Sequence, residues 1–271
     1  MANGYIQTPV YAWEAPYISG LKLAYGTTTT FTMASGSCTD STASNIITVD
    51  SAVTLTSTTV GVGGLDTGTL AASTLYYVYA IGNSYSYDAQ PGSEDSSSTG
   101  GVGTFVNPSP GTAVFSLTAP ATGPLLPTNY DMFRYVGSVY VNSSSNFVNF
   151  VQVGNGTARE MWYDVAISAL TGGSSATYAS VSLANIVPAS VVKVNVLATF
   201  TPTAASNALQ LLPYGSSASV GYAVLSGSVA AVATEANMSL PTGLNSSVPY
   251  IQYKVAGSST SLAIVSYSDQ L

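Results

Sequence analysis

Alternation of apolar and polar residues is the clearest pattern in the chain. Within residues 191–200 one face of the predicted strand is apolar and consists of Val192, Val194, Val196, Ala198 and Phe200. The opposite face is polar and carries Lys193, Asn195 and Thr199. Residues 250–257 repeat the pattern, with Ile251, Tyr253 and Val255 inward and Gln252 and Lys254 outward. A period of two residues predicts strands with one buried face.

Further strand candidates follow one another along the whole chain, separated by clusters of Gly, Pro, Asn and Ser. Helix signals are scarce, because few windows repeat apolar residues at helical spacing behind a capping residue. We therefore predict an all-β protein with two β-sandwich-like domains. The additional predicted strands are 46–49, 75–81, 113–118, 134–141, 147–153, 161–167, 177–183, 220–226, 229–234 and 261–267.

A composition change divides the chain into an N-terminal β domain, residues 21–168, and a C-terminal β-sandwich, residues 172–271. A short Gly/Ser-rich connector joins the two. Residues 82–103 lack periodicity and are rich in Gly and Ser, which predicts a long loop inserted in the first domain.

Residues 1–20 are aromatic, contain proline and lack extended strand periodicity. We interpret them as an N-terminal docking arm, with Tyr11, Trp13 and Tyr17 as candidate anchoring residues. The start of the chain lacks the basic and apolar regions of a signal peptide, so we expect the protein to fold in the cytoplasm where it is made.

Charge and composition exclude several classes of function. Only 6% of the 271 residues are charged, and five basic against twelve acidic residues give a net charge of −7. Too few cations exist to neutralise nucleic-acid phosphates, and no apolar run is long enough to insert in a membrane. The chain has no histidine and a single cysteine, Cys38, which removes the commonest metal ligand, the usual general base and any intrachain disulfide. We expect no cofactor, no metal and no enzymatic activity.

Short motifs that could carry chemistry have weak support. Ser190–Lys193 matches the S-x-x-K pattern of serine acyl-enzymes, but its four residues open a predicted strand, where the two side chains would point to opposite faces. Glu94 and Asp95, together with Asp88, offer carboxylates in a Ser-rich loop without the fixed spacing of a calcium site. We interpret these acids as solvated loop residues.

The nineteen tyrosines are more informative than the charged residues. Most are expected in the core, whereas Tyr85 and Tyr87 lie in the predicted loop, where little core is available to cover them. With Asp88, Glu94 and Asp95 they form a candidate partner-contacting loop. A surface so poor in charge invites association, so we predict an oligomeric structural protein.

Three segments follow one another in an order that resembles tailed-bacteriophage virion proteins: 63–81, 120–141 and 147–165. The shared features are a GGLD-x-G turn, a Tyr-rich strand, a P-x-x-Y-x-x-x-R-x-x-G-S segment and a strand ending in Gln. Residues 36–41 and the chain after residue 187 also resemble the family's opening strands and C-terminal sandwich. The matching residues are Gly63, Gly64, Leu65, Asp66, Gly68, Thr74, Tyr76, Val78, Ile81, Pro127, Tyr130, Arg134, Gly137, Ser138 and Gln152.

The resemblance implies a virion component that assembles in the host cytoplasm, is homotrimeric and acts by binding. Its expected partners are copies of itself, other virion proteins (capsid, portal or neck, tail) and a host surface receptor or glycan. The position stays open between fibre or spike, head fibre and capsid surface, with a capsid cement protein as an alternative. A tail-spike glycan-degrading enzyme using Glu94, Asp95 or Asp131 and a cellular adhesin are weaker alternatives. The chain departs from the family in its longer loop 82–103 and in a basic cluster reduced to Arg134.

Overall fold

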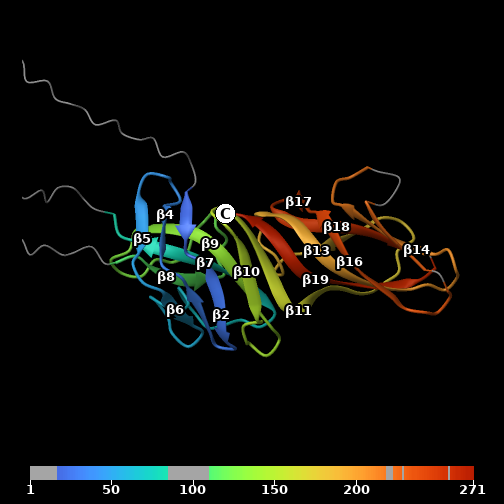
Figure 1. The fold of residues 1–271 in the computed structure, drawn as a ribbon, viewed down its shortest axis with the longest axis horizontal. Coiled ribbons are helices and arrows are strands. Elements are labelled where there is room, and N and C mark those ends of the chain that lie inside the picture. The colour runs from blue at the N-terminus through green and yellow to red at the C-terminus, as the bar shows by residue number, and fades with distance from the viewer. Residues whose placement is uncertain (1–16, 85–109, 218–221, 228, 256) are drawn as a thin grey trace, which may run out of the picture.

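The computed structural model describes residues 17–84, 110–217, 222–227, 229–255 and 257–271. These residues form nineteen strands joined by turns and loops, and none of them is helical (Figure 1). The prediction of an all-β, sandwich-like protein is confirmed. The molecule is elongated, with the first strands of the chain at one end and β14 at the other.

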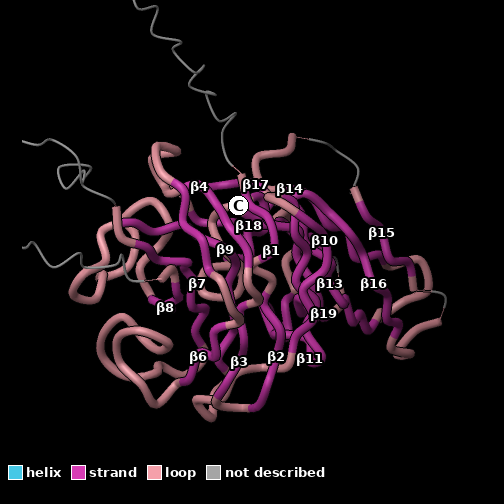
Figure 2. Tube along the Cα trace, turned by 60° about the vertical axis from the view of Figure 1, so that its left-hand side comes forward, coloured by secondary structure: helices cyan, strands magenta, loops and turns pink. Residues whose placement is uncertain are grey.

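The largest layer is an eight-stranded antiparallel sheet that runs along the molecule (Figures 1 and 2). The two longest strands of the chain, of 16 and 12 residues, pair with each other within this sheet. The order is β16 (Thr234–Pro241), β13 (Val191–Thr201), β19 (Ser259–Gln270), β11 (Ala158–Gly173), β10 (Phe150–Asn155), β2 (Leu23–Thr27), β3 (Thr30–Met33) and β6 (Val53–Thr56).

Three smaller sheets complete the fold. A single cluster of buried apolar residues draws on all four sheets. One small sheet has the order β8 (Thr112–Ser116), β7 (Thr74–Gly82) and β9 (Met132–Val141); another consists of β1 (Ile18–Gly20), β4 (Gly36–Thr39) and β5 (Ile46–Val49). The C-terminal small sheet has the order β12 (Ala179–Ser182), β18 (Val248–Val255), β14 (Ala208–Pro213) and β15 (Ala223–Ser226), with β17 (Gly243–Asn245) also paired to β18.

Aromatic rings fill the N-terminal half of the core. Phe31 packs edge-on against Phe147 and Phe115, with ring centroids 5.0 and 5.6 Å apart, geometry that suits the ring quadrupoles. Tyr76 and Tyr79, from β7, are fully buried. Both faces of this strand are covered, because Tyr76 packs against Phe115, whereas Tyr79 and the half-buried Tyr77 pack against Tyr135.

The Gly/Ser connector begins later in the chain than predicted. Residues 168–173 continue β11, because Ser168, Leu170 and Gly173 pair with β19 through register shifts that absorb the extra residues. Only residues 174–178 link β11 to β12. The large sheet thus contains strands from both sides of the predicted division at residues 168–172.

Two details of the strand predictions are wrong. A register shift after Val191 buries that residue in place of Val192, whose side chain is 48% exposed. Residues 229–233 do not form a strand, since the chain turns at Ala231, which has a φ of +60°, and β16 begins at Thr234. The inward residues of 250–257, by contrast, are buried as predicted.

The glycine-rich turn before β7 has a structural role. A side chain on Gly64 would lie 2.1 Å from the Thr59 carbonyl oxygen, so only glycine fits there. The Asp66 carboxylate accepts hydrogen bonds from the amide of Thr67 at 2.8 Å, which is typical of an Asp in a turn, and from the amide of Leu125 at 2.9 Å. Asp66 therefore ties the turn to the 117–131 loop.

Gly137 allows β9 to approach the large sheet. Its φ is +147°, and a Cβ atom there would lie 2.8 Å from Gln152 Nε2 and 3.0 Å from Leu23 Cδ1. Backbone strain and crowding would each cost about 1–3 kcal/mol.

We expect Gly137→Ala to lower the free energy of unfolding by about 3 kcal/mol in urea denaturation. Gly68→Ala is the matched control, because Gly68 also has a positive φ (+77°) but open space around its Cα; it should cost about 1–2 kcal/mol. Equal losses in the two variants would show that the close approach at Gly137 contributes nothing.

Candidate functional site

The predicted contact residues fall largely outside the described part of the chain. This applies to the anchoring candidates Tyr11 and Trp13 and to the whole candidate loop set, Tyr85, Tyr87, Asp88, Glu94 and Asp95. Tyr17 is described: it is exposed, and its hydroxyl lies 3.3 Å from Ser37 Oγ. That neighbouring hydroxyl lowers the pKa of Tyr17.

The motif residues of the resemblance lie at structural positions. Gly63, Gly64, Asp66, Gly68 and Tyr76 surround the turn before β7, and the Tyr76 hydroxyl accepts a hydrogen bond from the amide of Ala71 at 2.6 Å. Tyr130 is partly buried beside the core.

Arg134 lies on β9 opposite Ala80. Burial lowers its pKa, and the neighbouring Cys38 and Asp40 oppose this effect. Burial raises the pKa of the Cys38 thiol to about 12, so this lone cysteine is unreactive at neutral pH.

A cluster of buried polar side chains joins the sheets where β9, β11 and β19 meet. We call it the polar junction; it consists of Tyr135, Ser138, Gln152, Arg159, Tyr267 and Asp269. Arg159 is its centre and is 3% exposed. Its guanidinium donates hydrogen bonds to four carbonyl oxygens, those of Gly20, Leu21, Val136 and Gly156, at 2.7–3.3 Å.

Gln152 extends the bonding of Arg159. Its Oε1 accepts hydrogen bonds from Arg159 at 3.2 Å and from the amide of Leu23 at 2.8 Å. A planar guanidinium with five donors can satisfy several acceptors that diverge in direction, which a lysine cannot. The arginine thereby fixes β1, β2 and β9 relative to β11.

Asp269 lies at the opposite side of the junction and accepts a hydrogen bond from the Tyr135 hydroxyl at 2.6 Å. Burial raises its pKa, while nearby Ser190, Tyr135 and Arg159 partly compensate by favouring the charged form. Burial also lowers the pKa of Arg159 to about 10, so the arginine stays charged at neutral pH. The positive charge of Arg159 thus favours the charged form of Asp269 across the junction, against the effect of burial.

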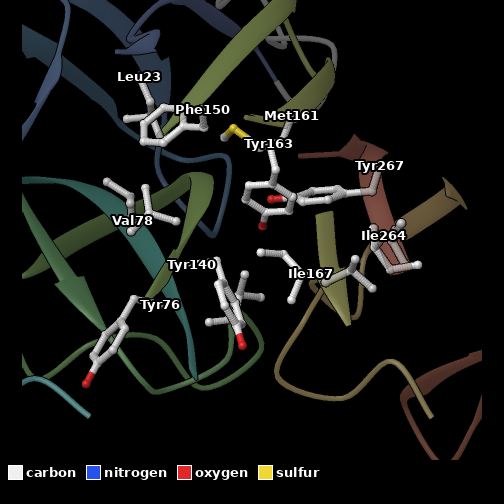
Figure 3. Close-up of a cluster of buried hydrophobic side chains, with 14 of the residues drawn as sticks. Leu23, Tyr76, Val78, Tyr140, Phe150, Met161, Tyr163, Ile167, Ile264 and Tyr267 are labelled. Carbon is white, nitrogen blue, oxygen red and sulfur yellow. The ribbon is translucent and has the colours of Figure 1, made fainter. Parts of the chain in front are cut away.

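Tyrosine rings cover the junction from the core side. The Tyr267 hydroxyl lies 2.5 Å from Ser138 Oγ, and its ring centroid is 6.0 Å from that of Tyr163 (Figure 3). Burial raises the pKa of both tyrosines far above the usual value. Both hydroxyls therefore stay protonated at neutral pH.

The cavity inside the polar junction is small. It has room for about one water molecule and is lined by Gly137, Met161 and Leu271 together with junction side chains. Asp269 Oδ1 and Ser190 Oγ are buried nearby without a hydrogen bond to any described residue. A space of this size admits no organic substrate, so the junction holds the sheets together.

Sequence reasoning missed Arg159 and Asp269 as important residues. A signal for Arg159 was present, because it alternates with the inward-facing Met161 and Tyr163 along β11 and thus occupies a core position. A charged residue at such a position predicts a buried, bonded group.

The S-x-x-K motif does not form a pocket. Lys193 pairs with Ser268 on the outer face of the large sheet, whereas Asp269, the neighbour of Ser190, faces the interior. Ser190 and Lys193 therefore lie on opposite sides of the sheet.

The outer face of the large sheet presents an apolar patch, which we define by Ala24, Val151, Val153 and Trp162. Val151 is directly opposite Ala24 on β2 and Trp162 on β11. The side chains of Val151 and Trp162 are 60% and 43% exposed, although they lie on central strands of the sheet. Exposed apolar side chains that adjoin one another are typical of contact sites.

Polar side chains border the patch on one side. Glu160 Oε1 accepts hydrogen bonds from Asn195 Nδ2 at 3.1 Å and from Ser266 Oγ at 3.2 Å. Asn195 also donates to Ser266 Oγ at 2.5 Å. A bonded polar rim beside an apolar centre is the usual arrangement of a protein–protein contact surface.

The paired strands and loops described above offer no sign of a metal site or of a membrane-spanning helix. Among the described residues, no group of three or more Cys, Asp or Glu side chains is placed to hold a metal ion. No helix in this part of the chain is long and apolar enough to cross a membrane. Comparison with family models, curated proteins and solved structures finds no match to this chain.

We expect Tyr135→Phe to lower the free energy of unfolding by about 1.5–3 kcal/mol at neutral pH, because the Asp269 carboxylate loses its hydrogen bond. The loss raises the pKa of Asp269 further. A carboxyl group whose pKa is raised in the folded state stabilises the fold at low pH, and this stabilisation is lost as the pH rises through the folded-state pKa. The loss of unfolding free energy caused by Tyr135→Phe should therefore be smaller in acid.

Urea denaturation from pH 7 down to pH 4 measures this change. Tyr25→Phe is the control, because the Tyr25 ring packs 6.3 Å from Phe150 and the structure describes no hydrogen bond from its hydroxyl. A Tyr135→Phe effect that is the same at every pH would show that the bond to Asp269 is not responsible.

Proposed function

We propose that the protein is a structural subunit of a tailed-bacteriophage particle and that it acts by binding. The observation that carries the proposal is the apolar patch in the middle of a large, charge-poor sheet face. An isolated subunit would expose this surface to water, whereas neighbours in an assembly would cover it.

The sequence resemblance supports the same proposal. Three of its motif residues, the neighbours Gly137 and Ser138 on β9 and Gln152 on β10, come from two of the matching segments and meet at the polar junction. Residues that fit together in this way belong to one architecture, and a resemblance in such structural sequence motifs suggests a virion component without assigning chemistry.

In this proposal the subunit is homotrimeric and contacts other virion proteins such as capsid, portal or tail components. The arm at residues 1–20 anchors it, and the loop at 82–103 faces a host receptor or glycan. A fibre, spike or head-fibre position and a capsid cement role both remain compatible with a subunit that works through its surfaces.

The described part of the chain gives the tail-spike enzyme less support. Asp131, one of the three acids considered for it, accepts hydrogen bonds from the amide of Ser84 at 2.6 Å and from the Ser84 hydroxyl. This carboxylate is engaged at the base of the loop that follows β7.

Electron microscopy of purified particles, labelled through an epitope tag in the 82–103 loop, tests the proposal. We expect label at the tail tip, along the tail or over the capsid, each of which selects one position. Sedimentation of the purified protein at low micromolar concentration should show a trimer or larger species. Particles without label, together with a monomer in solution, would refute the proposal.

A further inference from the structure

We propose that residues 1–16 of one copy bind the apolar patch of a second copy and so link subunits. This inference rests on the proposed function in taking the chain to be an assembling subunit, and it makes a neighbouring copy the partner to which the N-terminal arm anchors. It assigns a partner to a surface that the described residues leave uncovered.

The patch is suited to side-chain contacts and not to strand addition. Val151 and Trp162 belong to β10 and β11, whose backbones are already paired on both sides within the sheet. An occupant must therefore lie across the strands and bury the exposed faces of these residues. Tryptophan is among the residues that contribute most to binding energy at such surfaces.

The composition of residues 1–16 complements the patch. The segment carries Tyr5, Ile6, Tyr11 and Trp13, contains two prolines, and has no lysine or arginine. Aromatic side chains supply rigid contact area at low entropic cost, and proline reduces the entropy lost on binding.

Charge complementarity points the same way. Glu14 is the one charged side chain of residues 1–16. Lys22 lies two residues before Ala24, is exposed like Ala24 and forms no ion pair with any described residue. An arm lying on the patch could place Glu14 beside Lys22.

The attachment point of the segment favours a second copy over the same chain. The amide of Tyr17 donates to Thr39 Oγ1 at 3.2 Å, and the Tyr17 carbonyl accepts from the amide of Thr39 at 3.0 Å. These bonds hold Tyr17 in line with β1, in the small sheet of β1, β4 and β5. The segment thus starts in a layer other than the one that bears the patch.

The reach of the segment is sufficient to bridge two copies. Sixteen extended residues span about 50 Å, which is many times the spacing of about 4.8 Å between neighbouring strands. The root of the segment lies beside the β10–β11 hairpin, since a Cβ on Gly156 would be 3.8 Å from the Ile18 carbonyl oxygen. The root therefore lies at the turn of the hairpin whose strands carry the patch, and a segment of this length can extend from one copy to the patch of an adjacent copy.

A mixing experiment tests the exchange. One variant lacks residues 1–16 and keeps the patch; the other, Val151→Ser with Trp162→Ser, keeps the segment and loses the patch. We expect each alone to associate at least tenfold more weakly than the full chain in sedimentation equilibrium. Mixed together they should form a complex that contains both variants, because one supplies the segment and the other the patch.

The control is Val224→Ser, a substitution of a similarly exposed valine on the C-terminal small sheet, which should leave association unchanged. Circular dichroism and urea denaturation establish that all variants are folded. Tryptophan emission gives a second readout. Trp162 is the one tryptophan of the Trp13→Phe variant, which keeps residues 1–16, and also of the truncated chain, so the emission of Trp162 can be compared between the two. Its emission should move to longer wavelength when residues 1–16 are removed.

Two results would overturn the exchange and leave the proposed function standing. Undiminished association without residues 1–16 would show that subunits meet through another surface. A truncated chain whose Trp162 emission is unchanged would show that the segment does not cover the patch. A monomeric full chain whose Trp162 emission responds to truncation would assign the segment to its own patch, which also contradicts exchange.

Discussion

The hydrogen bonds of the buried Arg159 hold together parts of the chain that are far apart in sequence. Four carbonyl oxygens, from β1 to the β10–β11 hairpin, converge on one guanidinium, and Asp269 supplies a nearby negative charge. A buried cation is tolerated only when its donors are satisfied. This requirement ties the chain beside β1 and β2, and also β9, to β11 of the large sheet.

The scarcity of charged residues also determines which contacts the surface can make. Few ionic groups are available in the chain, and two of them, Arg159 and Asp269, are used in the interior. The outer face of the large sheet carries few charged side chains, Lys193 and Glu160 among them, beside hydroxyl, amide and apolar side chains. Val151 and Trp162 are prominent among the apolar ones. Such a surface contributes little to solubility and favours contact with another protein.

The local sequence predicted the strands well where apolar and polar residues alternate regularly. Residues 46–49 form β5 with the predicted bounds, and 250–257 bury the expected side chains, because one face of each strand packs on the core. Alternation failed at Val192, where a register shift changes which residue faces inward. Such a shift depends on pairing with β19, some 70 residues later, which no local pattern contains.

The polar junction was beyond sequence reasoning for a related reason. Arg159 is recognisable as a charged residue at an inward position, but its partners lie as many as 139 residues away and are mostly backbone carbonyls, which have no sequence signature. The patch combines residues of β2, β10 and β11 through their register. Composition alone predicted a charge-poor surface, whereas the location of the apolar patch on that surface could be found only from the fold.

Hydroxyl-radical footprinting of Trp162 tests most directly whether this protein works through an outer-face contact. The oxidation rate of Trp162 should fall as the protein concentration rises from nanomolar to micromolar, while that of Leu125, an exposed residue on the 117–131 loop, stays constant. A Trp162 oxidation rate that is the same at all concentrations would contradict the account.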